Sequence, residues 1–335
     1  MRLFGRIFRY VVTVIAIAGL IISIKACSSP PSPTTSAPSA ATSSSSPKQP
    51  ININTAILSE LDKLEAALGV PALSHKIQAS RPYGSPADLV SKNVLSQAQF
   101  EQIQAWVTVE EIELTGEAKD VDYMTKLGLM KGHMLVAQEL LALEQPQQAD
   151  PHLGHPVEEI YVDLEEQFQE RSVPEFKADL LAVQELVKSK PKDPQIAAKF
   201  EAAMQKIDGA IAVLPAAQRQ APAFVLQVMN GLLETASAEY TAAIANGKIK
   251  EAIEYQDSRG FVTYAQDTLL NSIEPAIQTA DAAAAQQLKE TFTALRRAWP
   301  APIPPATPVL SADEVAAKVK QLEMSSAPVL KATAS

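Results

Sequence analysis

Cysteine, glycine and aromatic residues are all scarce in this chain of 335 residues, which has one cysteine, 12 glycines and only 5% aromatic residues. A lone cysteine excludes an internal disulfide framework. Few glycines and aromatics, beside many helix-forming residues, disfavour sandwiches and barrels. We therefore predict an all-α protein whose helices pack through Ala, Leu, Ile and Val, with enough length for two folded units.

The sequence also lacks the short motifs of common enzyme classes. It contains no Gly-x-Ser-x-Gly turn and no glycine-rich phosphate loop. Its only cysteine, Cys27, directly follows an N-terminal apolar run, which is not the setting of a catalytic nucleophile. We therefore expect a non-catalytic protein.

Positive charge is sparse over most of the chain. Residues 1–50 hold five of the 29 basic residues and no acid, so residues 51–335 contain 24 basic residues against 38 acidic ones. A body of this charge repels phosphate backbones and anionic membrane surfaces unless a local basic patch overrides the repulsion, and the sequence shows no such patch. The charge therefore disfavours nucleic acid as a partner.

The first 27 residues have the order of an export signal. The basic segment "MRLFGRIFRY" precedes the apolar run "VVTVIAIAGLIISI", which is shorter than the about 20 residues of a membrane span, and Cys27 follows soon after. The segment resembles a bacterial lipoprotein signal with Cys27 as the lipidated residue, although Lys25 departs from that pattern. An uncleaved apolar anchor is the alternative. Both interpretations predict a membrane-anchored, extracytoplasmic protein on the periplasmic side of a bacterial membrane.

Composition and periodicity divide the rest of the chain. Ser, Pro and Thr dominate residues 28–50, which are expected to form a disordered linker. Short amphipathic segments predict a small helical module at 51–111, and longer ones predict an antiparallel bundle at 118–299. Its helices are expected at about 120–145, 156–171, 174–189, 193–213, 217–245, 248–277 and 280–298. The predicted C-terminal order is a Pro-rich crossing at 300–310, a helix at 311–325 and a loose tail at 326–335.

Two stretches of the module carry a family resemblance. "ININTA" at 51–56 and "RPYGSPADLVSKNVLSQAQFEQI" at 81–103 resemble the tandem helix-hairpin-helix domain of exported competence proteins, which bind incoming DNA. They also resemble the photosystem extrinsic subunit, which has this fold without binding DNA. The larger bundle faintly resembles imelysin-type periplasmic bundles linked to iron uptake, without a motif that can be aligned.

The DNA-binding members of the first family meet a phosphate with a Gly-x-Gly turn. Here Leu68 and Val70 stand at the two glycine positions, and the module has four basic residues against seven acids. We therefore expect a degenerate module retained for packing or protein contacts. The candidate anion or DNA contacts that remain are Gly69, His75 and Lys76.

Three of the four histidines lie within 23 residues, at 133, 152 and 155. His133 is expected on a helix, with the other two in the loop and cap that follow it. Far along the chain, Glu254 and Asp257 are three residues apart on one predicted helix face. Imidazoles and carboxylates on facing helices form metal sites in bundles, and mixed N/O donors suit iron, zinc or manganese. The candidate metal or polar cluster is His133, His152, His155, Glu159, Glu254 and Asp257.

The same residues also have a purely structural interpretation. His133 is then a core histidine with one hydrogen-bond partner, His155 and Glu158 cap a helix, and Glu254, Asp257 and Arg259 tie helices together. Gly128 and Gly132, four residues apart, predict the close approach of a neighbouring helix.

The sequence as a whole favours an exported, membrane-tethered lipoprotein that acts as a non-catalytic binding or assembly factor, in contact with the membrane and with another envelope protein. Two alternatives stay open. The bundle cluster predicts binding of a divalent or iron-type metal or of another small ligand. The resemblance of the module implies DNA binding, as in competence receptors.

Overall fold

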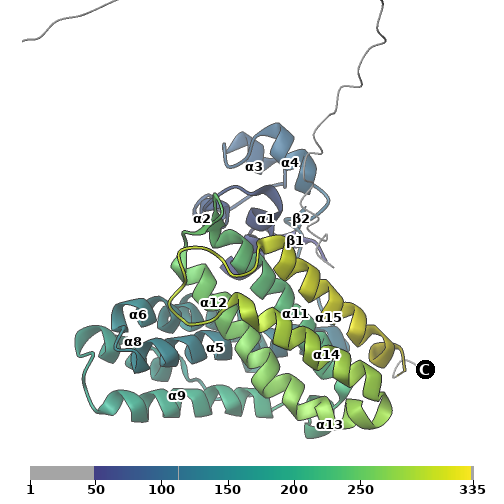
Figure 1. Cartoon of the computed structure of the whole chain (residues 1–335). Helices are drawn as coiled ribbons and strands as arrows, with labels where there is room; N and C mark the ends of the chain where they lie inside the picture. The colour runs from purple at the N-terminus through teal and green to yellow at the C-terminus, as the bar shows by residue number, and fades with distance from the viewer. Residues whose placement is uncertain (1–48, 112, 333–335) are drawn as a thin grey trace, which may run out of the picture. The chain divides into compact units, whose positions relative to one another are not determined.

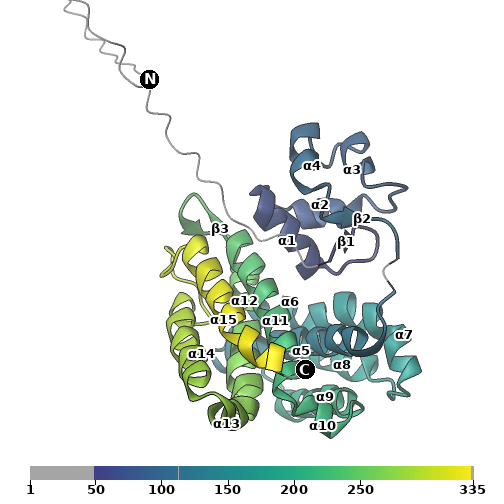
Figure 2. The same cartoon turned by 90° about the vertical axis from the view of Figure 1, so that its right-hand side faces the viewer.

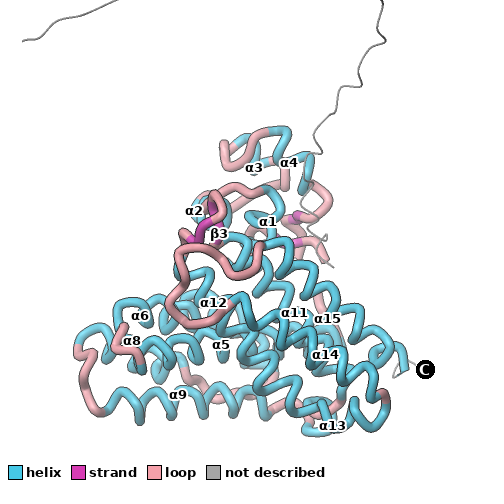
Figure 3. Tube along the Cα trace, viewed as in Figure 1, coloured by secondary structure: helices cyan, strands magenta, loops and turns pink. Residues whose placement is uncertain are grey.

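A computed structural model describes residues 49–111 and 113–332. Helices dominate these residues, which confirms the predicted all-α class with a small module followed by a larger helical bundle (Figures 1 and 3). The strands are short two-residue pairs. β1 (Ile51–Asn52) pairs in parallel with β2 (Val107–Thr108), and β3 (Ile244–Ala245) pairs antiparallel with β4 (Lys248–Ile249).

The N-terminal module, drawn in purple to blue in Figure 2, has its own hydrophobic core. Its helices are α1 (Leu58–Leu68), α2 (Leu73–Ala79), α3 (Asp88–Ser91) and α4 (Gln97–Ile103). Gly69 ends α1 with a φ of 60°, the left-handed conformation that glycine adopts at low cost. A capping box between Ser96 and Gln99 begins α4.

The first part of the bundle runs from α5 to α10. Its elements are α5 (Gly116–Ala142), α6 (Pro146–His155), the π-helical turn η1 (Pro156–Tyr161), α7 (Val162–Glu170), α8 (Lys177–Ser189), α9 (Gln195–Ala212) and α10 (Ala216–Arg219). The segment "QPQQADPHLGH" was expected to be a loop and is largely α6. Pro146 is pre-organised for the first position of a helix, and the segment buries Ala149, His152 and Leu153.

The expected helix cap at His155 is also wrong. His155 has helical backbone angles (φ −51°, ψ −42°) and its side chain caps nothing. Pro156 has no N–H to continue the α-helical hydrogen bonds, and the chain continues there as the wider π turn η1. His152 and His155 therefore lie on one continuous helical stretch.

The second part of the bundle runs from α11 to the C-terminal helix. Its elements are α11 (Pro222–Ala242), α12 (Ala252–Tyr264), the π turn η2 (Ala265–Leu270), α13 (Asn271–Ala280), α14 (Ala282–Leu295), the 3-10 turn η3 (Arg296–Ala298) and α15 (Ala312–Ala332). A capping box between Ser311 and Glu314 begins α15. This helix continues through residues that were expected to form a loose tail, and buries Ser326.

Two glycines bring α5 and α12 into backbone contact. A Cβ atom on Gly260 would lie 2.2 Å from the carbonyl oxygen of Gly132, and one on Gly132 would lie 2.6 Å from Phe261. The close approach predicted at Gly132 is thereby confirmed. Since His133 follows Gly132 and Asp257 lies one turn before Gly260, this crossing sets the distance between the two side chains.

No helix within residues 49–111 and 113–332 is both long and apolar enough to cross a membrane. This finding contradicts the expected membrane-anchored, extracytoplasmic location. The apolar run and Cys27, on which that expectation rested, lie outside the described residues.

Candidate metal centre

Three imidazole rings converge on one carboxylate. The Nδ1 atoms of His133 and His152 lie 2.7 and 2.6 Å from Asp257 Oδ1. The Nδ1 atom of His155 lies 3.3 Å from the other oxygen, Oδ2. One ligand atom from each of the four residues lies within 4.8 Å of the others. We call these four residues the His/Asp cluster.

The His/Asp cluster is assembled from three helical segments and is shielded from solvent. His133 comes from α5, His152 and His155 from α6, and Asp257 from α12. His133, His152 and Asp257 are buried, and His155 is half-buried. The Nε2 atom of His133 is buried without a hydrogen-bond partner among the described residues. Burial of this kind strengthens every electrostatic interaction within the cluster.

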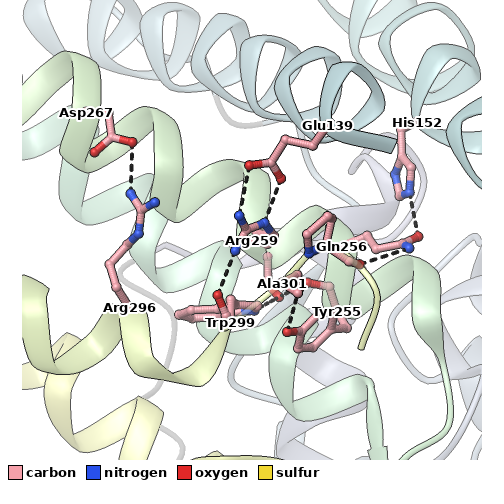
Figure 4. Close-up of polar contacts among 11 residues, drawn as sticks. Glu139, His152, Tyr255, Gln256, Arg259, Asp267, Arg296, Trp299 and Ala301 are labelled. Atoms are coloured by element: carbon pink, nitrogen blue, oxygen red, sulfur yellow. Dashed lines mark hydrogen bonds and ion pairs between the residues drawn. The ribbon is translucent and has the colours of Figure 1, made fainter. Parts of the chain in front are cut away.

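Gln256 determines which nitrogen of His152 carries a proton (Figure 4). The Gln256 amide donates to Gln148 Oε1 and to the Pro302 carbonyl, so its own oxygen faces His152 Nε2 at 2.9 Å. An accepting oxygen requires a proton on Nε2. In neutral His152 the Nδ1 lone pair therefore faces Asp257 Oδ1 at 2.6 Å. Two acceptors this close need either an extra proton or a cation between them.

The three histidines control the ionisation of Asp257. Burial alone raises the pKa of a carboxyl, but His133, His152 and His155 together hold the pKa of Asp257 well below its usual range. Burial lowers the pKa of His133 more than Asp257 raises it. For His155, burial also acts to lower the pKa, but Asp257 and Glu159 outweigh it and raise the value to about 9.

A cavity of about 60 Å³ adjoins the His/Asp cluster. We call it the carboxylate cavity because four acids line it besides Asp257: Asp62 on α1, Glu159 on η1, Glu239 on α11 and Glu254 on α12. The lining also includes His155, His75, Leu58, Ser59 and Ile253. Of the acids predicted from the sequence, Glu159 and Glu254 lie here and not in contact with the three converging rings.

Burial raises the pKa of all four acids. Glu159 and Glu254 each reach about 7. The pKa values of Asp62 and Glu239 rise well above the usual range, and repulsion between the neighbouring carboxylates adds to the effect of burial in both. Within residues 49–111 and 113–332, no Lys or Arg lines the cavity. The environment of these acids is thus the opposite of that of Asp257.

The candidate anion contacts of the module do not form an anion site. The Glu65 carboxylate accepts hydrogen bonds from the backbone N–H groups of Ala72 and Ser74, at 2.9 and 3.3 Å. These are the groups at the start of α2 that a phosphate would need. Lys76 is exposed, and His75 belongs to the lining of the carboxylate cavity. An internal carboxylate therefore occupies the position of the external anion.

Other polar side chains of α12 hold that helix in place (Figure 4). Arg259 donates two hydrogen bonds to Glu139 on α5, at 2.6 and 2.8 Å, and a third to the Trp299 carbonyl. The Tyr255 hydroxyl donates to the Ala301 carbonyl at 2.9 Å. Arg259 thus pairs with Glu139, whereas the structural interpretation of the sequence grouped it with Glu254 and Asp257.

Sequence reasoning missed Asp62 and Glu239, although each interrupts an apolar pattern. Asp62 lies between Leu61 and Leu64 on α1, close to the buried side of that helix. Glu239 lies in the last turns of α11, where its neighbours Ala238 and Tyr240 are buried. The signal available in the sequence was a charged residue at a position that the helical periodicity places in the core.

Part of this site lies in a stretch of the chain that is similar to a known domain family. Residues 215–333 match the family model of the iron permease-associated 4-helix bundle domain, and this stretch contains Glu239, Glu254 and Asp257. The three histidines of the cluster precede it. No curated protein and no solved structure matched the chain. The family match overturns both resemblances drawn from the sequence, to the helix-hairpin-helix domains of competence and photosystem proteins and to imelysin-type bundles.

Proposed function

We propose that this protein binds a transition-metal cation of the iron type at His133, His152, His155 and Asp257, and that it does so without catalysing a reaction. The observation that carries the proposal is the arrangement at His152. Gln256 holds the proton on Nε2, which leaves the Nδ1 lone pair facing the Asp257 carboxylate. A cation between the two acceptors relieves their repulsion and uses both as ligands.

The donor set fits iron. Three imidazole nitrogens and a carboxylate are mixed N/O donors, which suit iron, zinc and manganese more than calcium or magnesium. The matched domain is named for its association with iron permeases, which supports iron as the metal and a permease as the protein partner. Here the iron is cargo of the protein and not a resident catalytic cofactor.

The fold holds these donors in position before the cation arrives. Backbone contact between Gly132 and Gly260 fixes the distance from His133 to Asp257. The hydrogen bonds of Gln256 orient the His152 ring, and those of Arg259 anchor the helix that carries Asp257. Pre-organisation of this kind reduces the entropy that binding has to overcome.

Metal uptake by the full chain tests the proposal. The protein is stripped with a chelator, dialysed anaerobically against Fe²⁺ and analysed by mass spectrometry for bound iron. We expect one ion at the cluster, which His152→Ala removes and which Gln256→Met binds about 10- to 100-fold more weakly, because its second-shell hydrogen bond is lost. Gln286→Met, at an exposed position of α14, is the matched control and should bind like the wild type.

Two results would contradict this proposal. One is a wild type that takes up no iron above the level of His152→Ala. The other is iron binding that is equally strong in wild type, His152→Ala and Gln256→Met. Either outcome would leave the cluster with only its structural role, as a buried network of hydrogen bonds.

A further inference from the structure

The carboxylate cavity holds more negative groups than a single cation at Asp257 would use. Asp62, Glu159, Glu239 and Glu254 come from four different elements and face one space. In the part of the chain that the structure describes, none of the four forms a salt bridge with a Lys or Arg. Buried carboxylates without such compensation are costly, and the usual solutions are protonation or a bound cation.

The two most buried of these acids retain unused acceptor capacity. Asp62 is 5% exposed and Glu239 is 2% exposed. The Ser74 and Ser59 hydroxyls lie beside Asp62 and Glu239, and the Ser74 hydroxyl donates its proton to Glu65 Oε2 at 3.1 Å. A carboxylate has about four acceptor positions. Most of the lone pairs of these two side chains are therefore available to a ligand in the cavity.

The cavity also offers nitrogen donors and adequate space. The His155 and His75 rings belong to its lining, so its donors are not carboxylates alone. His155 and Asp257 are shared with the His/Asp cluster. A volume of about 60 Å³ exceeds the roughly 10 to 15 Å³ that one water needs, and so accommodates an ion with some of its water.

We propose that the carboxylate cavity is a second cation site, in which Asp62, Glu239 and Glu254, together with Glu159, hold a transition-metal cation beside the one at the His/Asp cluster. This inference rests on the proposed function for the first cation, with Asp257 lining both positions. The second site is oxygen-rich, and carboxylate donors suit a hard cation such as Mn²⁺.

The N-terminal module supplies one wall of this second site. Asp62 and Ser59 lie on α1 and His75 lies on α2, all outside the stretch that matches the iron permease-associated domain. Leu58, the first residue of α1, lines the cavity together with Glu159, and its backbone N–H lies beside the Glu159 carboxylate. The module is thus joined to the bundle at the cavity, and the second site is incomplete without it.

Mn²⁺ titration of the full chain tests the second site, with free Mn²⁺ followed by electron paramagnetic resonance. We expect two ions per chain in the wild type. The double variant Asp62→Asn, Glu239→Gln should retain one ion and bind the other at least about tenfold more weakly, since two of its anionic ligands become neutral. His152→Ala should lose the other ion. The control Glu111→Gln, Glu290→Gln removes the same charge at exposed positions and should still bind two ions.

The outcomes separate this inference from the proposed function. A wild type that binds one ion, lost in His152→Ala and kept in Asp62→Asn, Glu239→Gln, overturns the second site and leaves the first. One ion with the reverse pattern overturns the first site and supports the second. No bound ion in the wild type overturns both.

The melting temperature of the double variant shows whether lost binding reflects a folding defect. With no metal present, neutralising two mutually repelling carboxylates should raise the melting temperature, so lost binding would not reflect unfolding. If Asp62 and Glu239 have only a structural role, the double variant should have a lower melting temperature and an unchanged Mn²⁺ stoichiometry. That result would also overturn the proposal. Asp62→Asn alone is the milder variant for the same comparison.

Discussion

Asp257 and Glu239 are both buried carboxylates on neighbouring helices, α12 and α11, yet their pKa values move in opposite directions. Three imidazoles surround Asp257 and stabilise its charge, whereas Glu239 faces Asp62, Glu254 and Asp257 and its charge is opposed. Neighbours, more than burial, therefore decide the ionisation of each.

Because the charge around the two carboxylates differs, a bound cation would act differently in the His/Asp cluster and in the carboxylate cavity. In the His/Asp cluster, the pKa of His155 is raised to about 9, so that ring supplies positive charge beside Asp257, and a cation would lie between His152 Nδ1 and Asp257 Oδ1. In the carboxylate cavity, positive charge is absent among the described lining residues, and a cation supplies it. Metal binding would therefore stabilise the folded chain at either position, but only in the carboxylate cavity would it also relieve repulsion between carboxylates.

The largest expected effect comes from Gly260→Ala, which destroys the geometry on which both regions depend. The new methyl group would lie 2.2 Å from the backbone oxygen of Gly132, so α5 and α12 must separate and the 2.7 Å approach of His133 to Asp257 is lost. We expect a loss of about 3 kcal/mol or more in the free energy of unfolding, measured by urea denaturation. Iron uptake at the cluster should be lost as well.

Gly209→Ala is the matched control for that substitution. Gly209 lies inside α9, has ordinary helical φ and has nothing within 4 Å of a Cβ atom. Alanine there should be neutral or stabilise the protein by up to about 1 kcal/mol. Equal destabilisation by both substitutions would show that helical glycine in general, and not the crossing, determines stability.

The second prediction compares Asp257→Asn with Glu239→Gln in metal-free protein near neutral pH. Asp257→Asn removes the charge that the three rings of the His/Asp cluster share and should cost about 3 kcal/mol. Glu239→Gln relieves repulsion from Asp62, Asp257 and Glu254, so it should be neutral or stabilise by about 1 kcal/mol. Urea denaturation of both variants measures the two effects. Changes of the same sign would contradict the contrast drawn between the regions.

The sequence was sufficient to predict the all-α bundle and to nominate the four residues of the His/Asp cluster among its candidates. Amphipathic periodicity gave the all-α bundle, and the close spacing of His152 and His155 together with the i, i+3 pair Glu254 and Asp257 marked the site. Local signals failed around Pro156, where Gly154 and proline imitate a helix start inside a continuous helical stretch. The proposed roles of these residues stay predictions.

The carboxylate cavity could not be predicted from any single segment. Asp62 and Glu239 are 177 positions apart in the printed sequence, and only tertiary packing of α1 against α11 brings them to one space. The sequence also suggested an anion contact for His75, because its position in the hairpin was interpreted without the bundle beside it. An acid at a core position of one helix indicates a binding site only when the residues of the helix packed against it are known.

The third prediction is that metal-free protein loses stability as pH rises from about 5 to 9. Glu159 and Glu254 have folded-state pKa values of about 7, above the ordinary 4.5, so their contribution is complete at acidic pH and is lost as pH rises through 7. His155, with a pKa raised to about 9, acts with the same sign at higher pH. The lowered pKa of His133 opposes this trend below about pH 6.5, since that buried ring resists protonation.

Urea denaturation across this pH range, with a chelator and then with Mn²⁺, measures the effect. We expect a decrease on the order of 2 kcal/mol without metal, because the unfolded chain binds fewer protons than the folded one near pH 6 to 7. Mn²⁺ should reduce the decrease, since a cation in the cavity stabilises the ionised glutamates. Stability that rises with pH, or a pH dependence that Mn²⁺ leaves unchanged, would contradict the assignment of uncompensated charge to the carboxylate cavity.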